Sequence, residues 1–324
     1  MAVLSSATWL SAQQGPVFRA GTETVPVFVT VIGSDGRLAT DLTADSFQIL
    51  DNGRPQKITL FDATIQPVSI VIMLDMSGSM SGNIHTLRTA AVQMFTRLLP
   101  ADKARGGNVG NRIDIEPNHF TNDVDELTRA LWLDLEPGGP TPLWGALNAA
   151  MTALTHLEGR RVVLVLTDGK NTGLRMSAEG VPMGPTLKEI MDRAESEDFM
   201  IYSIGMRSSS GGFRGQGVPS GLGARGGFGG GGGRGGRNRA GESDEPDPGI
   251  RQLADASGGG YFELQGTTNL GEVFAKVADE LHRQYLIGYA MPEADGKVHH
   301  IDIRLADPTM EARARRTYIA TRKQ

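Results

Sequence analysis

Three continuous apolar runs mark the central part of the chain, at residues 68–74, 162–166 and 199–204. Runs of this kind are typical of parallel strands that are buried on both faces. Between the runs, apolar residues repeat at helical spacing in three stripes, each of which predicts one helix. The first stripe is Leu87, Ala91, Met94, Phe95 and Leu98, the second is Leu143, Leu147, Ala150, Met151 and Leu154, and the third is Leu187, Ile190, Met191 and Ala194. This alternation of strand and helix predicts a doubly wound, mostly parallel α/β sheet.

The flanks show a different pattern, in which apolar and polar residues alternate with period two. Before the α/β unit, strands are predicted at residues 25–31, 47–50 and 56–62, and after it at 285–290, 299–305 and 312–320. Turns of the Asp-Gly and Asn-Gly type separate several of them, which indicates antiparallel sheet. Each set alone is too small for a stable core. We therefore predict that the two sets pair into one β-sandwich with the α/β unit inserted between them, which brings the chain ends together.

The expected organisation has four parts: 1–17, a possible signal peptide or disordered tail; 18–67 and 284–324, the two halves of the sandwich; and 68–283, the α/β domain. Residues 1–12 are apolar and small, but a positively charged start is missing. A truncated signal peptide would place the protein in the periplasm or at the cell surface, and a cytoplasmic location stays open. Within the α/β domain, residues 207–248 are rich in glycine and arginine, so we predict a disordered insertion.

Composition narrows the possible chemistry. The 324 residues include no cysteine, which excludes disulfides, thiolate zinc sites and cysteine nucleophiles. The net charge of −5 does not favour a polyanionic partner. No apolar run approaches the roughly 18 residues that span a bilayer.

Candidate metal ligands follow the first apolar run. Asp75, Ser77 and Ser79 occupy alternate positions on a predicted strand-to-helix loop, where ligands bind in open α/β sheets. Asp168 ends the second run, and Thr141 precedes a predicted helix, so both loops can converge on the same rim. Three hydroxyls and two carboxylates are hard oxygen donors, which select one Mg²⁺, Mn²⁺ or Ca²⁺ ion. With few charged ligands, the ion would take an anionic oxygen from outside as its last ligand.

The pattern Asp-x-Ser-x-Ser at 75–79, the threonine in the loop Gly-Gly-Pro-Thr-Pro-Leu at 138–143, and Thr-Asp-Gly at 167–169 resemble the metal-ion-dependent adhesion site of von Willebrand factor type A domains. The resemblance covers about 68–283 and implies a six-stranded central sheet. It also implies that the ion grips an Asp or Glu side chain of a partner protein. The flanks are similar to a bacterial subgroup, the VWFA-related domain first defined in Acidobacteria. By resemblance, Ser77 and Ser79 bind the ion directly and Thr141 does so in the high-affinity state. Asp75 and Asp168 bind it directly or through water.

The sequence departs from the type A pattern in two places. Residues 104–115, where a strongly apolar second strand is usual, are polar and rich in glycine, so a regular strand there is in doubt. The second departure is the insertion at 207–248, which we expect near the rim that carries the metal, where it could extend the binding surface.

Two other functions stay open at this stage. A metal-dependent enzyme is one, although the chain has no Walker-type phosphate loop and no Gly-x-Ser-x-Gly nucleophile elbow. His85 is interpreted as an exposed residue of the first helix and not as a base, and the pair His299–His300 as a surface pair. RNA binding through the arginine-rich insertion is the other, although the acidic residues at its end would repel phosphate.

Overall fold

The protein was analysed as a computed structural model, which describes residues 23–169, 171–172, 175–176, 182–206, 246–264 and 269–321. The predicted signal segment at 1–17 and nearly all of the predicted insertion at 207–248 lie outside these residues. Within the described part of the chain, no helix is both long and apolar enough to cross a membrane.

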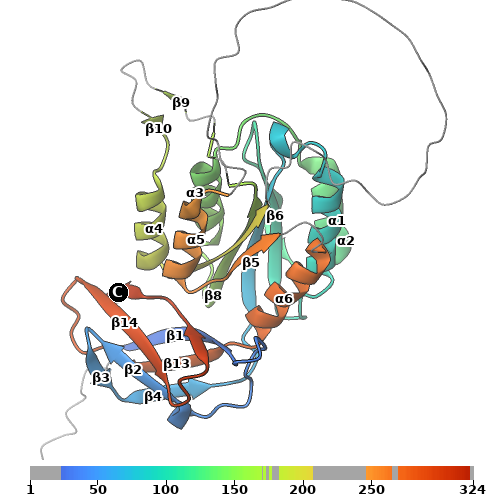
Figure 1. The fold of residues 1–324 in the computed structure, drawn as a ribbon. Coiled ribbons are helices and arrows are strands. Elements are labelled where there is room, and N and C mark those ends of the chain that lie inside the picture. The colour runs from blue at the N-terminus through green and yellow to red at the C-terminus, as the bar shows by residue number, and fades with distance from the viewer. Residues whose placement is uncertain are drawn as a thin grey trace, which may run out of the picture.

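A six-stranded sheet forms the centre of the molecule, as predicted (Figure 1). Its strands, in spatial order, are β12 (Tyr261–Leu264), β11 (Phe199–Met206), β8 (Arg160–Thr167), β5 (Val68–Asp75), β6 (Lys103–Val109) and β7 (Ile115–Thr121). All neighbours are parallel except β6 and β7. The three apolar runs of the sequence become β5, β8 and β11, whose residues are almost all buried.

Helices cover both faces of this sheet. On one face lie α1 (Ile84–Phe95), α2 (Val124–Arg129) and α6 (Leu270–His282), and on the other α3 (Leu143–Leu154), α4 (Leu187–Ser196) and α5 (Pro248–Ser257). Alternate residues of β5 show the division. Ile70 and Ile72 face the first helix layer, whereas Val71 and Met73 face the second. The doubly wound α/β prediction is therefore confirmed.

The doubtful strand at 104–115 divides into two strands. β6 keeps an unbroken parallel register with β5 from Lys103 to Val109, so the doubt about its regularity was wrong on that side. Against β7 the register shifts between Ala104 and Gly106. The glycines have a packing role: a Cβ on Gly107 would lie 2.5 Å from the sulfur of Met73, and one on Gly106 would lie 2.9 Å from Leu131. β6 has few apolar side chains of its own because Met73 and Leu131 occupy the space beside its glycines.

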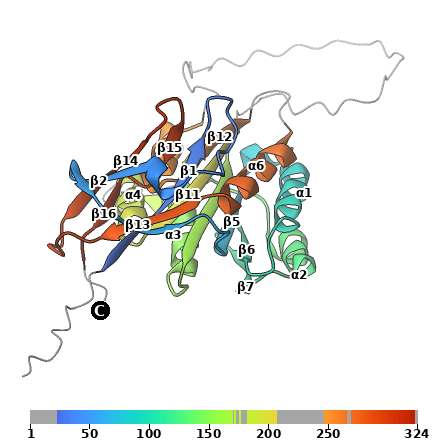
Figure 2. The same ribbon diagram turned by 90° about the horizontal axis from the view of Figure 1, so that it is seen from below.

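The two flanks form the predicted β-sandwich (Figure 2). One sheet has the order β15 (Glu311–Arg313), β1 (Thr24–Ile32), β13 (Tyr285–Ala290) and β4 (Ile58–Asp62). The other has the order β16 (Thr317–Ile319), β14 (Val298–Leu305), β2 (Phe47–Asp51) and β3 (Arg54–Gln56). In each sheet a strand from before the α/β unit pairs with one from after it, β1 with β13 and β2 with β14. Neither flank can complete its core without the other.

A buried polar cluster joins strands from both flanks inside the sandwich. The carboxylate of Asp51 accepts hydrogen bonds from the hydroxyls of Tyr289 (2.9 Å) and Tyr318 (2.7 Å), and it contacts Nδ1 of His299 at 2.7 Å. His299 is 7% exposed. Its interpretation as a surface residue was therefore wrong, because the start of β14 turns this side chain inward toward Asp51.

Candidate metal centre

The first loop of the candidate site lies at the carboxyl end of β5, the central strand. β5 ends at Asp75, a short turn of 3₁₀-helix (η2, Gly78–Met80) follows, and α1 begins at Ile84. The Asp75 and Ser77 side chains are buried, and Ser79 is exposed. The hydroxyl oxygens of Ser77 and Ser79 lie 3.0 Å apart. The alternate spacing therefore brings both hydroxyls to one point, as expected from the sequence.

The second loop reaches the same rim because β8 is the parallel neighbour of β5. Oδ2 of Asp75 accepts a hydrogen bond from the hydroxyl of Thr167 (2.7 Å), the last residue of β8, and Oδ1 accepts one from the backbone N–H of Ser77 (3.1 Å). Asp168, which is 1% exposed, follows directly. Burial raises the pKa of Asp75 above its ordinary value, and the nearby Asp168 carboxylate raises it further. Two buried carboxyl groups thus share this rim.

The third loop, which carries Thr141, is fastened to the first by backbone hydrogen bonds. The N–H of Gly78 donates to the carbonyl of Gly139 (2.9 Å), and the N–H of Gly138 donates to the carbonyl of Met76 (2.7 Å). Gly139 has a φ of +85°, which side-chain-bearing residues rarely adopt. Thr141 is 2% exposed. The five residues predicted from the sequence therefore lie on three adjoining loops at one rim of the sheet.

Two bracing residues, Asn171 and Thr172, were not singled out by the sequence analysis, and a third, Thr167, was named there only as part of the Thr-Asp-Gly motif. The hydroxyl of Thr172 accepts a hydrogen bond from the backbone N–H of Thr141 (3.0 Å), and the backbone N–H of Thr172 donates one to the carbonyl of Thr141 (2.8 Å). Asn171 accepts from the N–H of Leu143 at the start of α3 (3.0 Å). Thr167 also accepts from the N–H of Gly169 (2.9 Å). The bonds of Thr172 and Asn171 join the loop of Asp168 to the loop of Thr141, and that of Thr167 lies within the first of these loops. Their only signal in the sequence was a cluster of small polar residues around Asp168-Gly169.

The donor chemistry of this rim fits a hard divalent cation. Each candidate ligand offers oxygen, from three hydroxyls and two carboxylates, and such sets suit Mg²⁺, Mn²⁺ or Ca²⁺. A cation between Asp75 and Asp168 would offset both the cost of burying the carboxylates and their mutual repulsion. Among the described residues, no group of three or more histidine, cysteine or acidic side chains is placed to hold a metal, and this rim offers only two carboxylates beside its hydroxyls.

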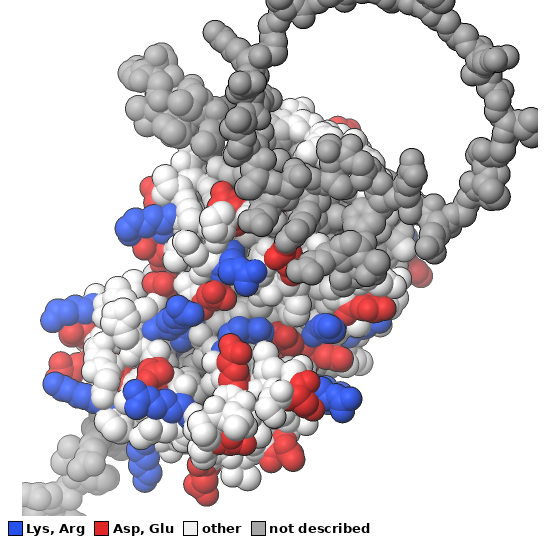
Figure 3. Space-filling view, viewed as in Figure 1, with Lys and Arg blue, Asp and Glu red and all other residues white. Residues whose placement is uncertain are grey.

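Away from the rim, the surface is mixed in charge. Where the face in Figure 3 is not covered by grey atoms, basic and acidic side chains are interspersed and neither sign forms a continuous field. His85, in the first turn of α1, is exposed and packs its ring against Trp132, with centroids 5.2 Å apart. That position confirms its interpretation as a residue of the helix surface.

Comparison with known proteins identifies part of the chain. Residues 69–216 match the family model described as the von Willebrand factor type A domain. No curated protein matches the chain.

Similar solved structures come from several bacteria. An aerotolerance-related membrane protein from Bacteroides fragilis is 17% identical, with a TM-score of 0.45, over 66% of this chain and 98% of its own. A von Willebrand factor type A protein from Catenulispora acidiphila is 13% identical, with a TM-score of 0.47, over 94% of this chain and 64% of its own. The von Willebrand domain of the type V pili tip protein Mfa5 from Porphyromonas gingivalis is 11% identical, with a TM-score of 0.44, over 67% of this chain and 95% of its own.

Proposed function

We propose that this chain, whose residues 69–216 match the family model of the von Willebrand factor type A domain, is a metal-dependent module that binds another protein. Domains of this family are typically protein-interaction or adhesion modules. In the proposal, Asp75, Ser77, Ser79, Thr141 and Asp168 hold one Mg²⁺ or Mn²⁺ ion, with Ca²⁺ as the third candidate. The ion takes an Asp or Glu side chain of the partner as its last ligand.

The observation that carries the proposal is that the three loops bearing these oxygen donors adjoin at one rim of the sheet, where Ser79 is exposed. Four of the five candidate ligands are buried, and Ser79 alone is exposed. An ion at this point would be held by the buried groups and approached from the side of Ser79. With only two carboxylates among its ligands, a divalent ion keeps net positive charge and favours an anionic oxygen from the partner.

The surrounding bonds suit such a role because they fix the donors in advance. The Asp75 carboxylate is oriented by Thr167 and by the Ser77 backbone, and the Thr141 backbone by Thr172. Donors that are already oriented lose little conformational freedom when the ion binds, so more of the interaction energy remains as affinity.

Calorimetric titration with Mg²⁺ and with Mn²⁺ tests the metal site directly. The expected result is one ion per chain for the unchanged protein and loss of binding in Asp75→Ala. Asp302→Ala is the control, because this exposed carboxylate on β14 pairs only locally, with Arg304 (2.9 Å). No heat of binding in the unchanged protein, or equal binding in Asp75→Ala, would overturn the proposed site.

The partner's contribution is tested separately, by capture with and without chelator. We expect a retained protein that is released by chelator and is absent from an Asp75→Ala bait. Retention that survives chelation would leave a protein-binding module in place but remove the metal from its mechanism. Export of the protein and its place in the bacterial subgroup remain predictions from the sequence.

A further inference from the structure

A small hollow lies at the junction of the α/β domain and the sandwich, at the rim opposite the candidate metal centre. It is bounded by the amino ends of β8 and β11, by Phe28 of β1 and by Arg315, which lies between β15 and β16. Its volume is about 20 Å³, which is room for roughly one water-sized molecule. The hollow therefore selects for a very small occupant.

Positive charge dominates the lining. Three arginines, Arg160, Arg161 and Arg315, face one acidic residue, Asp198. Asp198 is already paired, because its Oδ1 lies 2.8 Å from a terminal nitrogen of Arg315. Two guanidinium charges thus remain without a carboxylate among the lining residues.

Arg160 is the most deeply buried of the three, at 4% exposure. Its terminal nitrogens donate to the carbonyl of Leu281 and to the side-chain oxygen of Gln284, and its guanidinium lies over the ring of Phe28 at 5.0 Å. These partners are neutral. Burial lowers the pKa of Arg160 to about 10, so the group is still a cation at neutral pH. The Asp102 carboxylate favours the charged form of Arg160, but the hydrogen-bond partners of the guanidinium are neutral, so an anion close by would offset more of the cost of its burial.

The same three arginines share a second feature. The Nε–H of each is buried and meets no hydrogen-bond acceptor within the described part of the chain, as is also true of Arg88 and Arg313, which do not line the hollow. The terminal nitrogens of all three do have partners, on Leu281, Gln284, Glu197, Asp198 and Pro26. Each guanidinium is therefore anchored through its terminal nitrogens while its Nε–H has no acceptor, and a buried donor without an acceptor costs about 1–3 kcal/mol.

We propose that this hollow is an anion site that takes a small monatomic anion of the size of chloride. Three unsatisfied N–H donors, the excess positive charge and the small volume together favour such an occupant over an oxyanion. Its residues come from both domains, Arg160 and Arg161 from β8 and Arg315 from the sandwich. A bound anion would therefore tie the two domains together and stabilise the whole chain, independently of the metal at the other rim.

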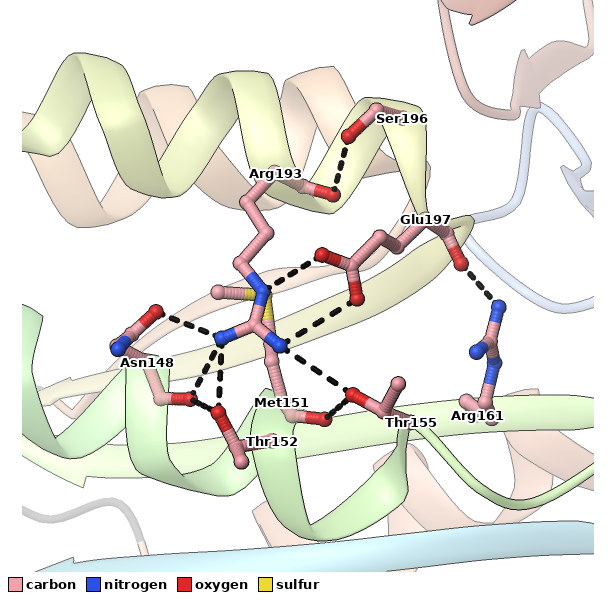
Figure 4. A network of polar contacts seen from close by, with 8 residues as sticks. All are labelled: Asn148, Met151, Thr152, Thr155, Arg161, Arg193, Ser196 and Glu197. Atoms are coloured by element: carbon pink, nitrogen blue, oxygen red, sulfur yellow. Dashed lines mark hydrogen bonds and ion pairs between the residues drawn. The ribbon is translucent and has the colours of Figure 1, made fainter. Parts of the chain in front are cut away.

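Arg193 provides a matched control for Arg161 (Figure 4). Both guanidinium groups stack on Phe199, at 4.5 Å for Arg161 and 5.9 Å for Arg193, and both contact Glu197. Arg193, however, is on α4 and is not part of the lining of the hollow. Its donors are taken up by Glu197, Asn148, Thr152 and Thr155. A substitution at either position removes similar packing, but only one of them removes a donor from the hollow.

The test compares thermal unfolding of the full chain in chloride with that in a bulky organic anion, at constant ionic strength and with chelator present. We expect chloride to raise Tm by about 2–4 °C with a saturable dependence on concentration. Arg161→Gln should lose this shift, and Arg193→Gln should keep it. Crystals soaked in bromide should show an anomalous peak in the hollow of the unchanged protein.

Several results would overturn the anion site. They are an equal Tm in both salts, a chloride shift that persists in Arg161→Gln, or an ordered water in the hollow without a halide peak. The metal titration is independent of all of these, so failure of one site would not obscure the other.

Discussion

At the scale of single residues, Asp75 combines deep burial with a carboxylate neighbour. Burial raises its pKa above the ordinary value of 3.8, and Asp168 adds to the rise. The folded chain then holds this proton more tightly than the unfolded chain does. In the absence of metal, stability therefore falls as pH rises through the raised pKa. An ion at this rim would offset the cost of ionising the buried Asp75 carboxyl. Protons would compete with the ion as the pH is lowered toward the raised pKa of Asp75.

Asp75→Asn should therefore separate stability from metal binding. In chelator, we expect the variant to be more stable than the unchanged protein by about 1 kcal/mol, because it removes a buried charge next to Asp168. On addition of Mg²⁺, the unchanged protein should gain in Tm and the variant should not. Thermal scans with and without chelator measure both effects. A variant that is less stable in chelator, or that still responds to Mg²⁺, would contradict this account of the rim.

Thr167 is the residue on which the orientation of Asp75 depends. Its hydroxyl donates to the Asp75 carboxylate and accepts from the N–H of Gly169. Thr167→Val keeps the side-chain shape but removes the hydrogen-bond partner of the Asp75 carboxylate and of the Gly169 N–H, both of which are buried. The substitution should lower the free energy of unfolding by about 1–3 kcal/mol and weaken metal binding. Thr167→Ser restores the hydroxyl and should recover most of both. Urea unfolding and metal titration measure the two effects, and equal behaviour of the valine and serine variants would refute this role.

The residues of the rim show what sequence reasoning could reach. Asp75, Ser77, Ser79, Thr141 and Asp168 could be placed together because each stands at the end or start of a predictable element. Asn171 and Thr172 could not, because their partners lie on another loop, and the register between two loops has no periodic signal. His299 was misplaced for a similar reason: its partner Asp51 is almost 250 positions away in the chain.

At the scale of elements, glycines set how closely the loops and strands approach. The polar, glycine-rich composition of β6 obscured a regular strand. The space beside its glycines is filled by side chains of other elements, Met73 from β5 and Leu131 from the helical turn after α2. A hydrophobicity pattern reports only the chain's own side chains and not those that neighbours supply. The large apolar runs of β5, β8 and β11 carried their own signal and were predicted correctly.

The loop of Thr141 depends on Gly139 in the same way. A Cβ at Gly139 would lie 2.6 Å from the Cβ of Asn111, and its φ of +85° disfavours any side chain. Gly139→Ala should therefore push the loop away from Met76 and Gly78, with a loss of about 1–3 kcal/mol in stability and weaker metal binding. Gly82→Ala, where the added methyl group meets open space, is the control and should change neither by much. Urea unfolding and metal titration are the measurements, and similar losses in both variants would exclude a specific role for Gly139.

At the scale of the whole molecule, ion pairs and buried polar groups join the two domains. Arg313 of β15 forms an ion pair with Glu280 of α6, and Arg315 forms one with Asp198 at the start of β11. Gln284, between α6 and β13, donates to the hydroxyls of Thr30 in the sandwich and Tyr202 in the central sheet. These polar bonds form only when both domains are folded. We therefore expect the α/β domain and the sandwich to unfold together in one transition.

The pair Glu280–Arg313 offers a test of this coupling. Glu280 is 6% exposed, and burial raises its pKa although Arg313 acts in the opposite direction. Arg313→Met would leave a buried carboxylate without its cation, which should cost about 3–5 kcal/mol at neutral pH. The pKa of Glu280 would rise further, so this loss should shrink as the pH is lowered and Glu280 becomes protonated in the folded state.

Adding Glu280→Gln to Arg313→Met removes the uncompensated charge, so the double variant should be more stable at neutral pH than Arg313→Met alone and should lose its dependence on pH. Urea unfolding at neutral and mildly acidic pH, followed by probes in each domain, gives all of these quantities. If the double variant were no more stable than Arg313→Met, the penalty would come from lost packing against Tyr202, 5.9 Å from the guanidinium, and not from buried charge. The domains would then be held together by shape and apolar contact, and their coupling would be insensitive to pH.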